Sequence, residues 1–291
     1  LKPWGWSPDS DCLLAPLAAG LPAKAVGSCW SDDMRGLYAK SWSAARLREF
    51  LGQRGEDFLC SQDIAGVACT SADEVLSVAG DFAAAGFAEM VIKAIYGSSG
   101  RDQIHCKGGQ LRDGQRGWLQ KIIKQQGEVV VEPWLQKAVD LSLHFDVGAE
   151  GAVQVRGWTR FITDDRGQYR SALIGQVAAG LNVELMKFFY GDGRDPRRLS
   201  KVGSALAAFL AGPLAKAGYR GPAGVDTLVY RDGADLKLKP IVEINPRMTM
   251  GRVALELRRM VNSARTGLWL VLSRREVEAV GFAGLTDCAQ H

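Results

Sequence analysis

The chain has 291 residues, of which 47% are hydrophobic and 23% are charged, and its formal net charge is +4. This composition indicates a folded protein with a sizeable core, and its mild, dispersed positive charge argues against a nucleic-acid interface but suits small anionic ligands. The sequence has no apolar run of membrane-spanning length and no visible secretory leader, so we expect no membrane association.

The cysteines and histidines predict neither a disulfide framework nor a zinc site. No two cysteines form a C-x-x-C pair, and the histidines are dispersed. A disulfide framework belongs to small secreted chains, and zinc needs clustered ligands, so we expect reduced, mostly structural thiols and a cytoplasmic location. The cysteines are Cys12, Cys29, Cys60, Cys69, Cys106 and Cys288, and the histidines are His105, His144 and His291.

In the first half of the chain, residues 1–70 show little helix or strand pattern, and the residues from Ser71 on show a clear one. Residues 1–70 are irregular apart from one amphipathic segment, SWSAARLREFL. Ser71 and Glu74 form a capping-box signature, which predicts a helix over the small apolar residues that follow. A strand is predicted from Met90 to Ile95, ahead of a flexible loop. A helix over GWLQKIIKQQG then leads into a further strand, EVVVEPWL.

The second half predicts antiparallel sheet and two helices. Alternating polar and apolar residues over 140–163 indicate strands, and a long helix is expected over about 196–217. Residues 221–247 predict a hairpin whose turn lies around 231–235, and a last helix starts near Met250. Interleaved helices and strands predict an α/β or α+β globule.

The segment PIVEINPRMTMG places polar groups on one face of a strand. Side chains alternate in a strand, so Glu243, Asn245 and, if the chain stays extended, Arg247 point the same way. Asp226 lies in the first strand of the same hairpin. Two carboxylates and a carboxamide oxygen are hard ligands that suit magnesium, although a solvated strand edge is the plain alternative.

Two further segments have a composition suited to a nucleotide. In VIKAIYGSSGRD, Lys93 precedes Gly97 and Gly100, and such a loop brings backbone amides close to phosphates; a small polar turn is the alternative. In VVVEPWLQKAVDLSLHF, the segment after Glu132 offers backbone donors and acceptors for an adenine edge, and Asp140 is placed to reach ribose hydroxyls. An ordinary strand connection is the alternative there.

The order of these three elements resembles the ATP-grasp superfamily, over about Ser71 to Val261. The resemblance is most specific in VIKAIYGSSG, GVDTLVY and VEINPRMTMG. It implies an α+β fold in which two lobes clamp ATP between antiparallel sheets. It divides the chain into a segment at 1–70, short or truncated compared with the domain that precedes the grasp in relatives, a small lobe at 71–131 and a large lobe at 132–291.

The resemblance also implies a reaction. It predicts an ATP-dependent ligase that joins a carboxylate to an amine through an acyl phosphate and releases ADP and phosphate, with ATP and Mg²⁺ or Mn²⁺ as cofactors. The partners would be small carboxylates and amines, among them amino acids or peptides, and a homodimer is left open. A kinase-like phosphotransferase and a non-catalytic nucleotide-binding protein are the alternatives.

Site residues follow from the same resemblance. Lys93 would contact phosphate beneath the loop, the hinge would hold adenine, and Asp140 would bind ribose. Arg247 would face the transferred phosphoryl group or the carboxylate. The loop residues are Gly97, Ser98, Ser99 and Gly100, the hinge residues are Glu132, Trp134 and Leu135, and the magnesium ligands are Asp226, Glu243 and Asn245. Lys40 is a weaker nucleotide candidate, and Arg156 and Arg160 are candidates for an anionic substrate.

Overall fold

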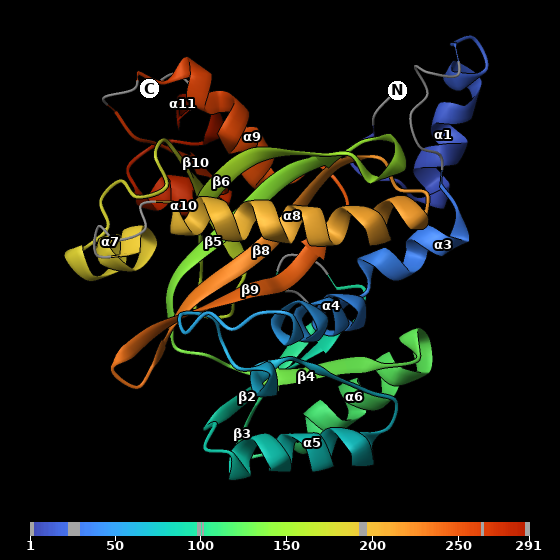
Figure 1. Cartoon of the computed structure of the whole chain (residues 1–291), viewed down its shortest axis with the longest axis vertical. Helices are drawn as coiled ribbons and strands as arrows, with labels where there is room; N and C mark the ends of the chain where they lie inside the picture. Colours follow the sequence, from blue (N-terminus) through green and yellow to red (C-terminus); the bar gives the residue numbers. More distant parts are fainter. Residues whose placement is uncertain are drawn as a thin grey trace.

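The protein consists of two antiparallel sheets packed against helices (Figure 1). The computed structural model describes residues 3–22, 30–97, 100, 102–191, 197–262 and 265–288. Within these residues, no helix combines the length and the apolar composition needed to cross a membrane. The two sheets and the helices packed against them confirm the α+β fold predicted from the sequence.

The smaller sheet has four strands in the order β1-β4-β2-β3. Helix α5 (Ala72–Ala84) begins where predicted, because the side chain of Ser71 accepts a hydrogen bond from the backbone N–H of Glu74. Helix α6 (Asp113–Gln126) covers the same face, and Met90 and Leu119 are fully buried between sheet and helices. The strands are β1 (Val67–Cys69), β2 (Glu89–Ala94), β3 (Gln103–Lys107) and β4 (Val129–Pro133).

The larger sheet has six strands in the order β10-β7-β6-β5-β8-β9. Its strands alternate between two environments: Leu141 and Leu143 point into the core beneath helix α8 (Arg198–Lys216), and Asp140 and Ser142 point to the opposite face. The hairpin turn lies between Asp232 and Asp235, as predicted. The strands are β5 (Lys137–Val147), β6 (Val153–Thr163), β7 (Tyr169–Ile174), β8 (Gly221–Asp232), β9 (Asp235–Asn245) and β10 (Gly267–Leu270).

Helix α4 (Lys40–Gly52) lies between the two sheets (Figure 1). Its residues Leu47 and Phe50 belong to the core of the large sheet, whereas Ala44 packs against Val130 of the small sheet. The helix therefore ties the lobes together and leaves the remaining space between them open. The other helices are α1 (Pro8–Ala18), α3 (Asp32–Arg35), α7 (Val183–Tyr190), α9 (Met250–Leu257), α10 (Arg274–Ala279) and α11 (Leu285–Cys288).

The first 70 residues are more regular than the sequence suggested. They contain α1, α3 and α4, and β1 lies before residue 71 although it belongs to the small sheet. Helix α1 has no buried residue, so it lacks the apolar stripe that marks a helix in sequence. Its start is set locally by the side chain of Ser7, which caps the helix, and by Pro8 at the first helical position.

Candidate functional site

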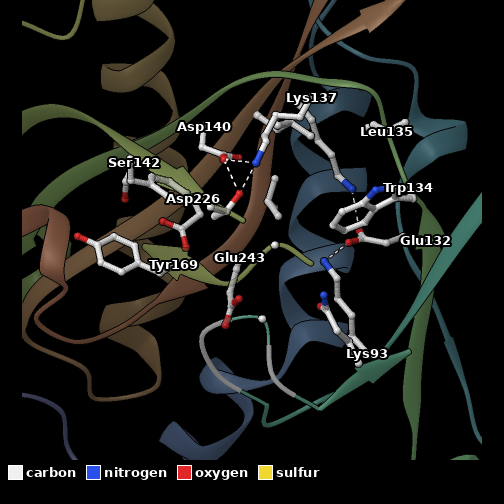
Figure 2. A pocket seen from close by; sticks show the side chains of 18 of the residues that line it. Lys93, Glu132, Trp134, Leu135, Lys137, Asp140, Ser142, Tyr169, Asp226 and Glu243 are labelled. Atoms are coloured by element: carbon white, nitrogen blue, oxygen red, sulfur yellow. Dashed lines mark hydrogen bonds and ion pairs between the residues drawn. The ribbon is translucent and has the colours of Figure 1, made fainter. Parts of the chain in front are cut away.

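A cavity of about 740 Å³ lies between the two sheets and is lined by side chains from both lobes (Figure 2). Ten residues predicted for the site line it. Ser98 and Ser99 lie outside the described residues, and Gly97 contributes its carbonyl oxygen to a lysine at the cavity. The ten residues are Lys93, Gly100, Glu132, Trp134, Leu135, Asp140, Asp226, Glu243, Asn245 and Arg247.

One wall of the cavity is the polar face of the large sheet. Asp226 of β8 lies directly opposite Glu243 of β9, and it also lies opposite Ser142 of β5. Asn245, two residues after Glu243, donates from its side-chain amide to Asp226 Oδ2 at 3.1 Å. The side chain of Arg247 reaches the same group, because its Nη2 donates to Asn245 Oδ1 at 2.8 Å. The alternation predicted for the strand therefore brings these four side chains together.

The two opposed carboxyl groups of Asp226 and Glu243 repel each other when both are ionised. Burial, together with the nearby carboxylate of Glu243, raises the pKa of Asp226 to about 7. A divalent cation between carboxylate oxygens would remove that cost, and carboxylate and carboxamide oxygens are ligands that magnesium accepts. Within the described part of the chain no three His, Cys, Asp or Glu residues cluster as metal ligands, so the candidate donor set is two carboxylates and one amide.

Lys40 contributes a cation to the same wall. Its Nζ donates to Glu243 Oε1 at 2.7 Å and to the carbonyl oxygen of Gly97 at 2.7 Å. The side chain is 10% exposed, so this ion pair is largely shielded from water. Lys40 therefore joins Glu243 of the large sheet to the start of the glycine-containing loop and lines the cavity, and its contact with a nucleotide stays a prediction.

Glu132 is held between two lysines from different lobes. Lys93 of β2 donates to its Oε1, and Lys239 of β9 donates to Oε2 at 2.7 Å. Burial alone would raise the pKa of Glu132, but the two ammonium groups lower it to about 2. The resemblance predicts a role for Glu132 mainly through its backbone, and the structure shows that its side chain is also the central acceptor of this buried cluster.

The hinge between the lobes follows Glu132. The backbone N–H of Trp134 donates to the carbonyl oxygen of Glu89 at 2.8 Å, and the Trp134 ring meets the His105 ring edge-on, with centroids 4.4 Å apart. Leu135 lines the cavity beside it. These contacts fix an apolar, backbone-lined edge of the cavity, of the kind that a flat aromatic ring can occupy.

Asp140 lies at the start of β5, beyond the hinge. Its Oδ2 accepts a hydrogen bond from Thr163 Oγ1 at 2.9 Å and pairs with Lys137 Nζ at 2.9 Å. Burial raises the pKa of Asp140, although Lys137 and Thr163 oppose that effect. Figure 2 shows Asp140 on the same side of the cavity as Asp226, across from Lys93 and Glu132.

The two arginines proposed for an anionic substrate have different surroundings. Arg160 donates to the carbonyl oxygens of Val177 at 3.3 Å and Ala179 at 2.7 Å, which gives it a role in holding a loop. It does not line the main cavity, whose lining residues come from other positions. Arg156 pairs with Asp146 at 2.5 Å and lines a second, smaller cavity.

Sequence analysis missed several residues that line the cavity, notably Lys239 and Tyr169. Tyr169 of β7 has a buried hydroxyl with no hydrogen-bond partner among the described residues. Burial and the nearby Asp226 raise its pKa to about 12, so it stays a neutral donor. A buried hydroxyl of this kind is suited to a polar ligand atom. The available signal for Lys239 is its position in the predicted hairpin, as a charged residue directly before the apolar segment PIV.

The N-terminal segment also contributes to the site. Gly5 forms an isolated antiparallel bridge with Arg247, and the backbone N–H of Met248 donates to the carbonyl oxygen of Trp4 at 2.7 Å. A Cβ atom at Gly5 would lie 3.1 Å from the Cβ of Arg247. This close approach positions the backbone that carries Arg247, and it joins residues far apart in sequence, so no local pattern reveals it.

Comparison with solved structures identifies the architecture. A Campylobacter jejuni biotin carboxylase in complex with β,γ-ATP superposes with a TM-score of 0.56 at 15% identity, covering 87% of this chain and 50% of that one. The biotin carboxylase domain of Hydrogenobacter thermophilus 2-oxoglutarate carboxylase, with MgADP and bicarbonate, gives 0.53 at 16% identity, covering 80% and 44%. The chain has the ATP-grasp fold.

A third structure with the ATP-grasp fold supports the same assignment. N5-carboxyaminoimidazole synthetase from Staphylococcus aureus, complexed with ADP, gives a TM-score of 0.51 at 11% identity, covering 83% of this chain and 58% of that one. The chain therefore spans about half the length of the chains it matches. No protein-family model and no curated protein sequence matches it significantly.

Proposed function

We propose that this ATP-grasp protein is an ATP-dependent ligase that joins a carboxylate to an amine and releases ADP and phosphate. The observation that carries the proposal is the cavity between the sheets, where the carboxylate pair of Asp226 and Glu243 lies across from Lys93 and Glu132 of the small sheet. The similar solved structures include complexes with ADP, with MgADP and with β,γ-ATP, which supports a nucleotide in this cavity.

The small lobe and hinge would bind the nucleotide. The adenine would lie along the hinge beside Leu135 and the Trp134 backbone, and Asp140 would accept a hydrogen bond from a ribose hydroxyl. Lys93 would leave Glu132 to contact a phosphate oxygen, in a charge-assisted hydrogen bond. Lys239 would remain on Glu132, so the buried carboxylate keeps a counter-charge throughout.

The acid wall would hold Mg²⁺ or Mn²⁺ through Asp226, Glu243 and Asn245. When bound, the cation neutralises phosphate charge. Short contacts already hold these side chains in place: hydrogen bonds of Asn245 link Asp226 to Arg247, and Lys40 forms an ion pair with Glu243. The carboxamide of Asn245 would turn its oxygen toward the cation, and Asp226 would release its proton.

Arg247 is the residue we assign to the reacting carboxylate. A carboxylate that attacks the γ-phosphorus approaches a highly charged triphosphate, so a fixed cation must lie where the two meet. The carboxylate oxygen forms a bond to phosphorus as the bond to the ADP oxygen breaks, which yields an acyl phosphate. The amine then attacks the acyl carbon, phosphate leaves, and the amine gives up a proton. The cleft between the lobes limits access of water to the intermediate.

Product analysis with labelled substrate tests this proposal. The protein is incubated with MgATP, pooled carboxylates labelled with oxygen-18 and pooled amines, and the released phosphate is examined by mass spectrometry. A ligase releases ADP and labelled phosphate when both substrates are present. ADP without phosphate would indicate a kinase-like enzyme, and unlabelled phosphate from an active enzyme would exclude the acyl phosphate. Glu243→Gln is the inactive control.

A further inference from the structure

A second cavity, of about 460 Å³, adjoins the main one at Arg247, which lines both. Apart from Arg247, its walls come from three parts of the chain that do not line the main cavity: the N-terminal residues 3–6, the turn between β5 and β6 with the adjoining strand ends, and the start of β8 with the two residues before it. The guanidinium of Arg247 is tethered at 2.8 Å to Asn245 Oδ1 and at 3.3 Å to the carbonyl oxygen of Met248. One positioned arginine therefore stands between the two spaces.

The walls of the second cavity combine apolar and cationic groups. Trp6 is buried and Trp4 is half exposed, and both line the cavity beside aliphatic residues of the turn. Among the described lining residues, three are arginines and one is an aspartate, Asp146. The apolar lining residues are Pro3, Trp4, Trp6, Val147, Ala152, Val153 and Pro222, and the arginines are Arg156, Arg220 and Arg247.

The single acidic group of this cavity is already neutralised. Asp146 accepts from Arg156 at 2.5 Å, and its other oxygen pairs with Arg252 at 2.9 Å. Both arginines lower the pKa of Asp146, against the effect of its burial. Arg247 donates to the neutral oxygens of Asn245 and Met248, so it brings positive charge to the border of this cavity, and the cavity volume falls in the range of small-ligand pockets. An anion with an aromatic or aliphatic portion matches these walls better than a cation or a sugar.

We propose that the second cavity binds the apolar portion of the carboxylate substrate, while its carboxylate lies at Arg247 on the border with the main cavity. This proposal rests on the proposed function for the role of Arg247, and it names the substrate class: an anionic amphiphile about the size of an N-blocked aromatic amino acid. The aromatic lining supplies contact area for the side chain, and the planar guanidinium of Arg247 suits a carboxylate at its border.

A matched pair of substitutions on strand β6 tests the proposal. Val153 and Val155 are similarly exposed, at 37% and 39%, but only Val153 lines the cavity among the residues described. Val153→Trp would fill the space, and Val155→Trp adds the same bulk elsewhere on the strand. Thermal unfolding of both variants checks that they fold, and titration with an ATP analogue in Mg²⁺ checks the main cavity independently.

The binding of four test ligands is then measured by calorimetry: N-acetyl-tryptophan, N-acetyl-phenylalanine, N-acetyl-leucine and N-acetyl-glycine. We expect at least one apolar ligand to bind the wild type and Val155→Trp alike, at least tenfold more weakly to Val153→Trp, and at least tenfold more weakly as its neutral amide. Binding of none of the four, or equal binding to Val153→Trp, would overturn the proposal. If the protein does not bind the ATP analogue but the test ligands behave as expected, the proposed function is overturned and the result for this cavity stands.

Discussion

Asp226 and Glu243 face each other directly across strands β8 and β9, with the side-chain amide of Asn245 bonded to Asp226 on the same face. Two carboxyl groups in this position cannot both ionise without cost unless a cation lies between them. Burial, and after it the facing carboxylate of Glu243, raise the pKa of Asp226 to about 7. We therefore propose that Asp226 exchanges its proton for a metal ion when the cation binds at this wall of the cavity.

Replacing Asp226 by Asn should stabilise the metal-free protein at alkaline pH. Because the folded-state pKa of Asp226 is raised, ionisation of this residue destabilises the protein as the pH rises from the unfolded-state pKa near 4 toward 7. Above pH 7 this destabilisation stays constant. We expect Asp226→Asn to be more stable than wild type by a few kcal/mol, roughly 2–4, at pH 8 in chelator, and about equal at pH 4. Urea unfolding at the two pH values measures this. A variant less stable at pH 8 would contradict the assignment.

The same residue should make magnesium binding depend on pH. Since the cation requires ionised Asp226, we expect the apparent Mg²⁺ affinity to increase as the pH rises through about 7 and to level off above it. Calorimetric titration with Mg²⁺ from pH 6 to 8.5 provides the measurement. Asp226→Asn should bind Mg²⁺ weakly at every pH, and a wild-type affinity that does not change with pH would argue against this ligand.

The effect of Glu132 on stability should depend on pH in the opposite way to that of Asp226. The folded-state pKa of Glu132 is lowered to about 2, so it stabilises the protein above its unfolded pKa near 4.5, and that contribution is lost as the pH falls toward 2. We expect Glu132→Gln to be less stable than wild type at pH 7 and to show a smaller loss of stability between pH 5 and pH 3. Urea unfolding at pH 7, 5 and 3 tests this, with Glu49→Gln on the exposed side of α4 as control.

Lys239 and Lys93 should be separable by their effects. Lys239→Met leaves Glu132 with one cation, and we expect the free energy of unfolding to fall by about 3 kcal/mol. Lys93→Met should reduce ATP affinity, by roughly tenfold or more, because it also removes a phosphate contact. Chemical unfolding and fluorescence titration with a labelled ATP analogue report on the two effects. Equal nucleotide affinity in Lys93→Met and wild type would remove Lys93 from the phosphate site.

The contribution of Arg247 to turnover should depend on Gly5, which packs against it. Arg247→Lys keeps the charge but loses the planar fork, so we expect turnover to fall severely while ATP affinity stays close to wild type. Gly5→Val would press on the Arg247 side chain, because a Cβ there lies 3.1 Å from it, and should lower turnover in the same direction. Gly20→Val, where nothing lies within 4 Å, is the control. Steady-state kinetics distinguishes the variants.

The strand patterns were predictable because side-chain alternation is a local property. Glu243 and Asn245 share a face in the sequence as they do in the structure, and the capping signature at Ser71 starts a helix. The ATP-grasp fold followed from the order of such motifs along the chain. The lobe boundaries at 70 and 131 and the roles of the site residues stay predictions.

What could not be predicted depends on contacts between distant segments. Lys239 lies in an apolar strand, and its partner Glu132 is 107 positions away, so its role emerges only when the lobes are assembled. The bridge between Gly5 and Arg247 has the same character. Helix α1 was not predicted because it buries nothing and so carries no periodic signal, whereas α4 coincides with the amphipathic segment SWSAARLREFL.

Strand β5 serves two compartments at once, and this restricts how its gene can change. Leu141, Leu143 and Phe145 fill the core, while Asp140 and Ser142 between them face the cavity. Substitution at one position alters one compartment. Insertion or deletion of a single codon would reverse the direction of every following side chain in the strand. The apolar side chains would then face the cavity, and the polar ones would face the core. Length variation among related genes should therefore collect in the turn at 148–152 and leave the strand itself unbroken.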